Sequence, residues 1–164
     1  MAASLDGFIA GPNGEYDWIM PDPAVDFMEL YKEFDTALMG RLTFELAESG
    51  PGARLPGMQT IVCSRTLRSA DFPKFTITPD AVAAVAALKS ESGKDIWLFG
   101  GGALFRSLLD AGLADTVEVE VMPVLLGQGA PLLPGGARPY GLQLSHCKAK
   151  PNGIVSLSYI ATRV

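Results

Sequence analysis

The chain has few of the residue types that build disulfide frameworks or metal centres. Only two cysteines and one histidine occur among its 164 residues. Cys63 and Cys147 do not form a Cys-x-x-Cys pair, which favours a reduced, cytoplasmic protein over a secreted disulfide scaffold. His146 precedes Cys147, but neighbouring residues of a strand point to opposite faces, so the two do not form a site. We therefore expect no metal centre.

Positive charge and long apolar runs are also scarce. Thirteen Lys and Arg stand against eighteen Asp and Glu, a net charge of -5, which excludes the basic face that nucleic-acid binding requires. Gly, Pro or a charged residue interrupts every apolar run, so we expect no membrane span, and the N-terminus lacks the pattern of a secretory leader. An acidic chain that binds a phosphorylated ligand must place its few cations locally, which makes Arg41 and Arg65 candidates.

Glycine, in contrast, is concentrated at one point. The apolar run 95–99 leads into Gly100, Gly101 and Gly102, and a helical pattern begins at Ala103. Glycine has no Cβ, so the backbone can turn sharply and a ligand can approach it closely. The unpaired N–H groups of a helix N-terminus suit a phosphate. The spacing is not Gly-x-Gly-x-x-Gly, and a tight turn without a ligand stays an alternative interpretation.

Two further turns follow apolar strands. Gly40-Arg41-Leu42-Thr43 offers a guanidinium for a phosphate and a hydroxyl that can cap a helix, and Ser64-Arg65-Thr66 offers groups that suit a ribose phosphate. Each could also be an ordinary surface loop. Because ligands of open α/β sheets bind at the carboxyl ends of the strands, the three turns together predict one ligand site.

The order of elements predicts a single α/β domain over residues 1–164, with parallel central strands. Asp80 is the predicted N-cap of a helix, and Pro151-Asn152-Gly153 is the predicted turn of an antiparallel C-terminal hairpin. The predicted strands are 4–10, 36–40, 59–64, 75–78, 95–99, 116–126, 142–150 and 154–162, and the predicted helices are 23–34, one beginning at 43, 81–90 and 103–110.

Four segments, spread over most of the chain, resemble motifs of the dihydrofolate reductase superfamily. They are Ser4–Ala10, Leu38–Glu45, Val62–Arg65 and Phe99–Phe105. The chain is most similar to the branch that includes the reductase domain of riboflavin biosynthesis. The resemblance implies a central, mostly parallel eight-stranded sheet flanked by helices, with NADPH across its carboxyl edge. It also implies dihydrofolate reductase or 5-amino-6-(5-phosphoribosylamino)uracil reductase-like activity.

The resemblance assigns the cofactor-binding residues by motif. Gly40, Arg41 and Thr43 would hold the pyrophosphate and adenosine side of NADPH, and Ser64 and Arg65 would contact its 2′-phosphate. The residues that would support the pyrophosphate and the nicotinamide end are Gly100, Gly101, Gly102, Leu104 and Phe105. Those that would face the nicotinamide and the substrate are Asp6, Ala10 and Trp18.

The implied chemistry is hydride transfer from the cofactor to a C=N or C=O bond of a pterin-like, folate-like or ribityl-aminopyrimidine-like substrate. The candidate catalytic acids are Asp6 and Asp26, and either could instead be a solvated or capping aspartate. Trp18, Phe27 and Tyr31 could wall a flat ring, although a core role for the helix aromatics is the alternative.

Several features leave the function open. The segment 17–26 is longer and richer in proline than its counterpart in the classical folate enzyme, which puts folate activity in question. A non-catalytic nucleotide- or small-molecule-binding protein of the same fold is the alternative function. The apolar segment Thr116–Leu126 and the loop Gly127–Gly136 could form a homodimer surface, or a central strand and a surface loop. The sequence also begins almost inside the first strand.

Overall fold

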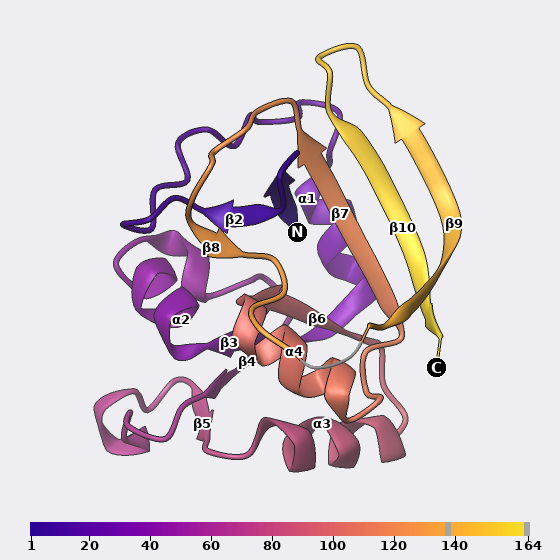
Figure 1. Cartoon of the computed structure of the whole chain (residues 1–164). Coiled ribbons are helices and arrows are strands. Elements are labelled where there is room, and N and C mark those ends of the chain that lie inside the picture. Colours follow the sequence, from indigo (N-terminus) through magenta and orange to yellow (C-terminus); the bar gives the residue numbers. More distant parts are fainter. Residues whose placement is uncertain (137–138, 163–164) are drawn as a thin grey trace. The chain divides into compact units, whose positions relative to one another are not determined.

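The chain, described here as a computed structural model over residues 1–136 and 139–162, contains two compact units (Figure 1). The first unit comprises Met1–Pro21 and Leu108–Val164, and the second comprises Asp22–Ser107. Within the described ranges, no helix has the length and the apolar character needed to cross a membrane.

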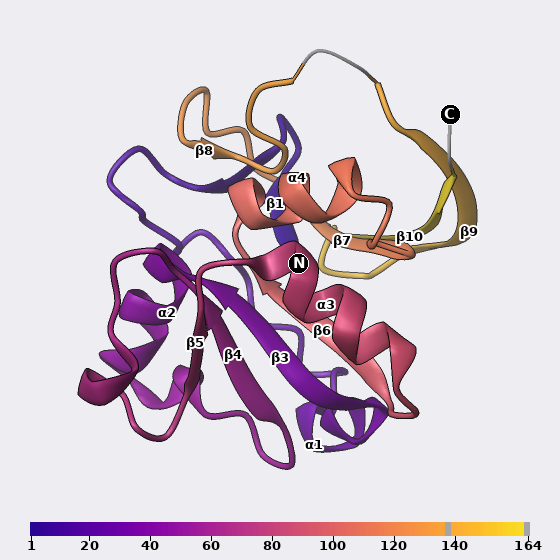
Figure 2. The same ribbon diagram turned by 90° about the horizontal axis from the view of Figure 1, so that it is seen from below.

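The second unit contains a four-stranded parallel sheet in the order β5-β4-β3-β6 (Figure 2). Its strands are β3 Phe34–Gly40, β4 Gln59–Cys63, β5 Thr76–Thr78 and β6 Asp95–Gly100. Leu38 of β3 pairs with Ile61 on one side and with Leu98 on the other. The predicted parallel arrangement of these strands is therefore confirmed, and β3 is the buried central strand that parallel pairing favours.

Each of the next three helices begins within three residues of the end of a strand. They are α2 Arg41–Glu48, α3 Ala81–Ser90 and α4 Gly102–Asp110, with short 3-10 turns η2 Pro51–Ala53 and η3 Ser69–Asp71. The predicted cap of α3 is confirmed, because the Asp80 carboxylate accepts a hydrogen bond of 2.9 Å from the backbone N–H of Ala83.

One face of the sheet forms an apolar core with α2. Ala37, Met39 and Val62 are fully buried, and alternate residues of a strand point to the same face. Phe44 of α2 is also fully buried, and its ring meets those of Phe72 and Phe75 at centroid distances of 5.2 and 4.9 Å. This packing fixes α2, and therefore the Gly40 turn before it, against the sheet.

The predicted helix over residues 23–34 is wrong for most of its length. The structure has only α1 Phe27–Leu30, followed by the 3-10 turn η1 Tyr31–Glu33 and then by β3. The rings of Tyr31 and Phe34 both pack on Trp97 of β6, at centroid distances of 5.7 and 5.2 Å. These tertiary contacts replace the helical stripe that the spacing of the apolar residues indicated.

The first unit contains a second four-stranded sheet in the order β1-β7-β10-β9. Its strands are β1 Ala2–Ser4, β7 Thr116–Met122, β10 Val155–Thr162 and β9 Gly141–Ala149. Strands β1 and β7 are parallel, whereas β10 pairs antiparallel with both β7 and β9. Because β7 has a hydrogen-bonded neighbour on each side, its edge is not free to pair with a second chain.

Two short strands of the first unit differ from the prediction. Residues 4–10 form the end of β1 and a separate β2 Phe8–Ala10, because the chain turns between them with a 2.9 Å bond from Gly7 N–H to Ser4 C=O. Strand β2 pairs with β8 Ala130–Pro131, which lies in the segment predicted as a loop. The described residues thus hold ten strands in three sheets, not the one sheet of eight strands that the resemblance implied.

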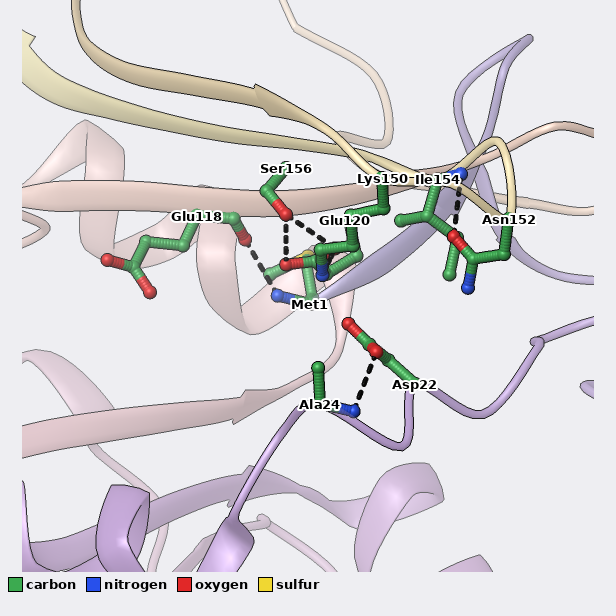
Figure 3. Close-up of polar contacts among 9 residues, drawn as sticks. All are labelled: Met1, Asp22, Ala24, Glu118, Glu120, Lys150, Asn152, Ile154 and Ser156. Carbon is green, nitrogen blue, oxygen red and sulfur yellow. Dashed lines mark hydrogen bonds and ion pairs between the residues drawn. The ribbon is translucent and has the colours of Figure 1, made fainter.

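A polar cluster joins the strands of the larger sheet in the first unit. The Glu120 carboxylate of β7 accepts bonds from Lys150 Nζ at 2.7 Å and from Ser156 Oγ at 2.9 Å (Figure 3). Asn152 Oδ1 accepts from the Ile154 N–H at 3.3 Å in the turn between β9 and β10. The cluster ties β7, β10 and that turn together.

Candidate functional site

Three turns lie at the carboxyl edge of the β5-β4-β3-β6 sheet. In the register of the strands, Met39 is opposite Gly100, and Gly40 is opposite Cys63, the residue before Ser64. The ends of β3, β4 and β6 are therefore level with one another, and the turns that follow them share one edge. This is the edge at which open parallel sheets bind ligands.

The Gly40 and Gly100 turns are in close contact. A Cβ on Gly40 would lie 3.7 Å from both Gly100 O and Gly101 N, and a Cβ on Gly100 would lie 3.2 Å from Thr43 Oγ1. Gly100 has a φ of +155°, which side-chain-bearing residues rarely adopt, and the Gly100–Gly101 peptide bond is cis. Gly40, Thr43 and Gly100 thus form a tightly packed cradle, in which the Thr43 hydroxyl lies against the backbone of Gly100 and Gly101.

Helix α4 begins directly after this cradle, at Gly102. The N–H groups of its first turn have no partner within the helix, whereas the Phe105 N–H already donates to Gly101 O at 3.0 Å. The side chains of Leu104 and Phe105 are buried, so these two residues could contact a cofactor only through their backbone. Their side chains instead hold the helix in place.

The two predicted arginines differ in their surroundings. Arg41 Nη1 forms an ion pair of 2.8 Å with Glu45 one turn later on α2, and both side chains are about half-exposed. Arg65 is exposed and forms neither an ion pair nor a hydrogen bond with any described residue. Of the two, Arg65 is therefore the cation that is available to an anionic ligand without breaking an existing contact.

Ser64 shapes the turn after β4. It is buried, and its Oγ accepts bonds from the N–H groups of Thr66 and Leu67 at 3.2 and 3.0 Å. Its own N–H donates to Thr78 O at 2.9 Å. These bonds place Arg65 at the tip of the turn, and the Ser64 oxygen accepts from the backbone of that turn.

The first candidate acid, Asp6, accepts hydrogen bonds from distant backbone. Its carboxylate accepts from Ser4 Oγ at 2.6 Å, from Gly127 N–H at 2.7 Å and from Leu126 N–H at 3.1 Å. The Ser4 and Gly127 bonds, which favour the charged form, lower the pKa of Asp6 to about 2. The group is consequently ionised at neutral pH, and its oxygens tie the β1–β2 turn to the segment after β7.

The second candidate acid, Asp26, caps α1. Its Oδ1 accepts from the N–H groups of Met28 and Glu29 at 2.9 and 3.2 Å, and the side chain is exposed. This arrangement is the capping role that the sequence left open as an alternative. Both candidate acids thus have backbone donors as partners.

The predicted substrate residues fall in both units. Trp18 and Ala10 lie in the first unit, where Trp18 Nε1 donates to Glu15 O at 3.0 Å and Ala10 pairs with Ala130 of β8. Phe27 and Tyr31 lie in the second unit, with ring centroids 6.1 Å apart. Phe27 is 51% exposed and does not belong to the core.

Sequence reasoning missed the residues that hold Asp6 and β2. Gly127 donates to Asp6, and Gly129 approaches Ala10 so closely that a Cβ on it would lie 2.1 Å from Ala10 O. The sequence contains the Gly127-Gln128-Gly129 spacing, but its pattern predicts only a loop there. Close glycine spacing after a strand is the signal that could have identified a second tight backbone contact.

Comparisons with known proteins agree with these motifs. The family model "RibD C-terminal domain" matches residues 1–156. YyaP of Bacillus subtilis (strain 168) is 32% identical over 171 residues, covering 97% of this chain and 91% of YyaP. The riboflavin biosynthesis protein RibD of Corynebacterium ammoniagenes is 25% identical over 151 residues, covering 80% of this chain and 44% of that protein.

The likeness extends to the fold. A crystal structure of a Shewanella sp. PV-4 protein, whose name assigns it to riboflavin biosynthesis, has a TM-score of 0.84 and 26% sequence identity, covering 99% of this chain and 97% of that one. The resemblance carried by the four sequence motifs is confirmed, and the chain belongs to the RibD C-terminal domain family.

Proposed function

We propose that the chain is an NADPH-dependent reductase of a small heterocyclic substrate, in the class of the pterins, folates and ribityl-aminopyrimidines. The observation that carries the proposal is the carboxyl edge of the β5-β4-β3-β6 sheet. There, a glycine cradle, a helix N-terminus and the partner-free Arg65 side chain lie at the ends of neighbouring strands. Membership of the RibD C-terminal domain family supports it.

The residues at this edge fit a dinucleotide phosphate. The cradle of Gly40, Thr43 and Gly100 would admit a pyrophosphate close to the backbone, and the first turn of α4 would donate N–H groups to it. Arg65 would pair with the 2′-phosphate, which NADH lacks. Arg41 would join them only by leaving Glu45. NADPH, when bound, supplies the hydride.

The contribution of this chain to catalysis is then binding and orientation. Asp6 is ionised at neutral pH, so we propose that it positions the segment at Leu126 and Gly127 and does not donate a proton. Asp26 would act chiefly as the cap of α1. Phe27 and Tyr31, which both lie in the second unit, are proposed to contact the flat ring of the substrate.

A nucleotide-binding protein without turnover is the second candidate function. The observation in its favour is that backbone donors engage both candidate acids. Consumption of NADPH in the presence of dihydrofolate or a ribityl-aminopyrimidine separates the two candidates, because only a reductase oxidises the cofactor.

Nucleotide binding tests the cofactor site directly. We expect the purified protein to bind NADPH more tightly than NADH in calorimetry, and Arg65→Gln to weaken NADPH binding at least about tenfold while leaving NADH binding nearly unchanged. Arg68→Gln is the matched control, because Arg68 lies three residues further along and pairs with Asp71. Equal affinity for both nucleotides would contradict the assignment of Arg65.

We also propose a homodimer that acts in the cytoplasm. Strand β7 is interior, so the expected surface at 116–126 is better replaced by the edge strand β9, where Leu142 and Leu144 are 46% and 54% exposed. Cys63 and Cys147 are free thiols, which suits a reducing compartment. Light scattering that gives only a 17.3 kDa species would end the dimer proposal.

A further inference from the structure

A pocket lies in the second unit, at the amino ends of strands in the β5-β4-β3-β6 sheet. It has a volume of about 320 Å³ and opens where β4 and β5 begin, at Gln59 and Thr76. The candidate cofactor edge lies where the same strands end. The pocket therefore shares no lining residue with the three turns at the carboxyl edge.

Two positive side chains line this pocket without a counter-charge. Arg54 and Lys74 form no ion pair or hydrogen bond with any residue in the described part of the chain. Lys32, Arg41 and Arg68, in contrast, each pair with a carboxylate three or four residues away. The uncompensated charge at the pocket is close to +2.

Two hydrogen bonds and a cation–π contact hold the residues that line the pocket. The buried Thr60 donates its hydroxyl to Ala53 O at 3.0 Å, which fixes the backbone just before Arg54 to the start of β4. The Arg54 guanidinium carbon lies 5.8 Å from the centre of the Phe75 ring, within the range of a cation–π contact. Gln59 Nε2 donates to the buried Thr36 Oγ1 at 3.1 Å.

The lining is also partly apolar. Met58 and Phe75 contribute thioether and ring surface, and Thr76 adds an exposed hydroxyl. A pocket that combines two cations, polar groups and a small apolar floor suits a ligand with an anionic end and an organic body. Its volume is at the lower end of the range for small-molecule sites, which suits a small ligand.

We propose that this pocket binds a small organic phosphate monoester. A phosphate monoester carries about -1.5 to -2 charges at neutral pH, which matches the two unpaired cations. Arg54 offers a planar, bidentate donor, and Lys74 adds a second positive charge. The organic part contacts Met58 and the Phe75 ring, while Thr76 and Gln59 offer hydrogen bonds at the rim.

The test is a titration of the ¹⁵N-labelled full chain with phenyl phosphate, followed by NMR. We expect saturable shifts of the backbone amides of Gln59, Thr60 and Thr76. Inorganic phosphate should shift the same amides with weaker affinity, and phenol should not shift them. Absence of saturable shifts there overturns the proposal. If inorganic phosphate binds with the same affinity as phenyl phosphate, the organic group is not recognised. That result overturns the proposal of a monoester site and leaves a general anion site.

Variants separate a specific site from general electrostatics. Arg54→Gln and Lys74→Gln should each weaken phenyl phosphate binding at least about tenfold, whereas Arg54→Lys, which keeps the charge, should weaken it less. Arg68→Gln removes one positive charge from the same unit but lies outside the pocket, so it should bind like the wild type. Equal weakening by all of these variants would contradict the proposal.

This outcome is independent of the cofactor site. Arg54 and Lys74 are exposed, so their variants are expected to fold, which circular dichroism verifies. Shifts confined to the amides of residues 64–66 and 100–104 would mean that phenyl phosphate binds at the carboxyl edge, which overturns the second site and leaves the proposed NADPH site intact.

Discussion

At the scale of single residues, the Asp6 carboxylate accepts hydrogen bonds from more donors than Asp26, the other candidate acid, does. Three donors from two separate segments reach it, and one of its partners lies 121 residues away along the chain. Hydrogen bonds of this kind favour the charged form, so Asp6 stabilises the folded state as an anion. A proton donor would need a pKa close to the working pH.

Asp6→Asn should therefore destabilise the protein in a pH-dependent way. The pKa falls from 3.8 to about 2 on folding, so the stabilisation is complete above about pH 4 and is lost as the pH falls through 2. We expect calorimetry to show a midpoint of thermal unfolding a few degrees lower for the variant at pH 7, and a smaller difference at pH 2.5.

The control for this comparison is Asp17→Asn, because Asp17 is exposed and has no hydrogen bond in the described structure. Its unfolding midpoint should follow that of the wild type at every pH. A wild-type turnover profile with an ionisation near neutral pH that disappears in Asp6→Asn would contradict the positioning role.

The residue scale also shows what the sequence could and could not predict about the site. Gly40, Thr43 and Gly100 were predictable because each stands directly after a strand, and parallel strands end at one edge. The role of Asp6 was not predictable, because its backbone donors follow β7 at Leu126 and Gly127, a contact that no local pattern encodes.

At the scale of elements, α3 is a helix whose stability depends on its start. Its residues Ala81–Ser90 are apolar around most of its circumference, and only Val85 is buried, so packing fixes the helix less than usual. The Asp80 cap, with its 2.9 Å bond from the Ala83 N–H, supplies a local start signal that adds to this limited packing.

Asp80→Ala should therefore lower the free energy of unfolding by about 1 kcal/mol, the usual cost of losing an aspartate cap. Asp80→Asn, which keeps the acceptor oxygen, should cost much less. Urea unfolding followed by circular dichroism measures both. Asp95→Ala, at the exposed start of β6, is the control and should change little. Equal losses for Asp80→Ala and Asp80→Asn would mean that charge, not the capping bond, stabilises α3.

The contrast between α3 and α1 explains where element prediction failed. Both segments begin with an aspartate cap, but the segment after Asp26 carries aromatic residues with a tertiary partner. Tyr31 and Phe34 both pack on Trp97, a residue of β6 that no local window includes. Tertiary packing therefore ended the helix after Leu30 and moved Phe34 into β3.

At the scale of the whole molecule, two proposed anion sites lie at the two edges of one sheet. Strand β4 runs from Gln59, at the phosphate pocket, to Cys63, next to Ser64. At about 3.3 Å per residue the two ends of this strand are roughly 13 Å apart. Groups separated by more than about 10 Å with no shared partners act independently.

NADPH and phenyl phosphate should therefore bind at the same time. In calorimetry, the dissociation constant of NADPH should change less than about twofold when phenyl phosphate is present at saturation, because the local cations that hold each ligand differ. A decrease in apparent NADPH affinity that grows in proportion to the phenyl phosphate concentration would mean that both ligands share the carboxyl edge. Retention of that competition in Arg54→Gln, together with its loss in Arg65→Gln, would identify Arg65 as the shared partner.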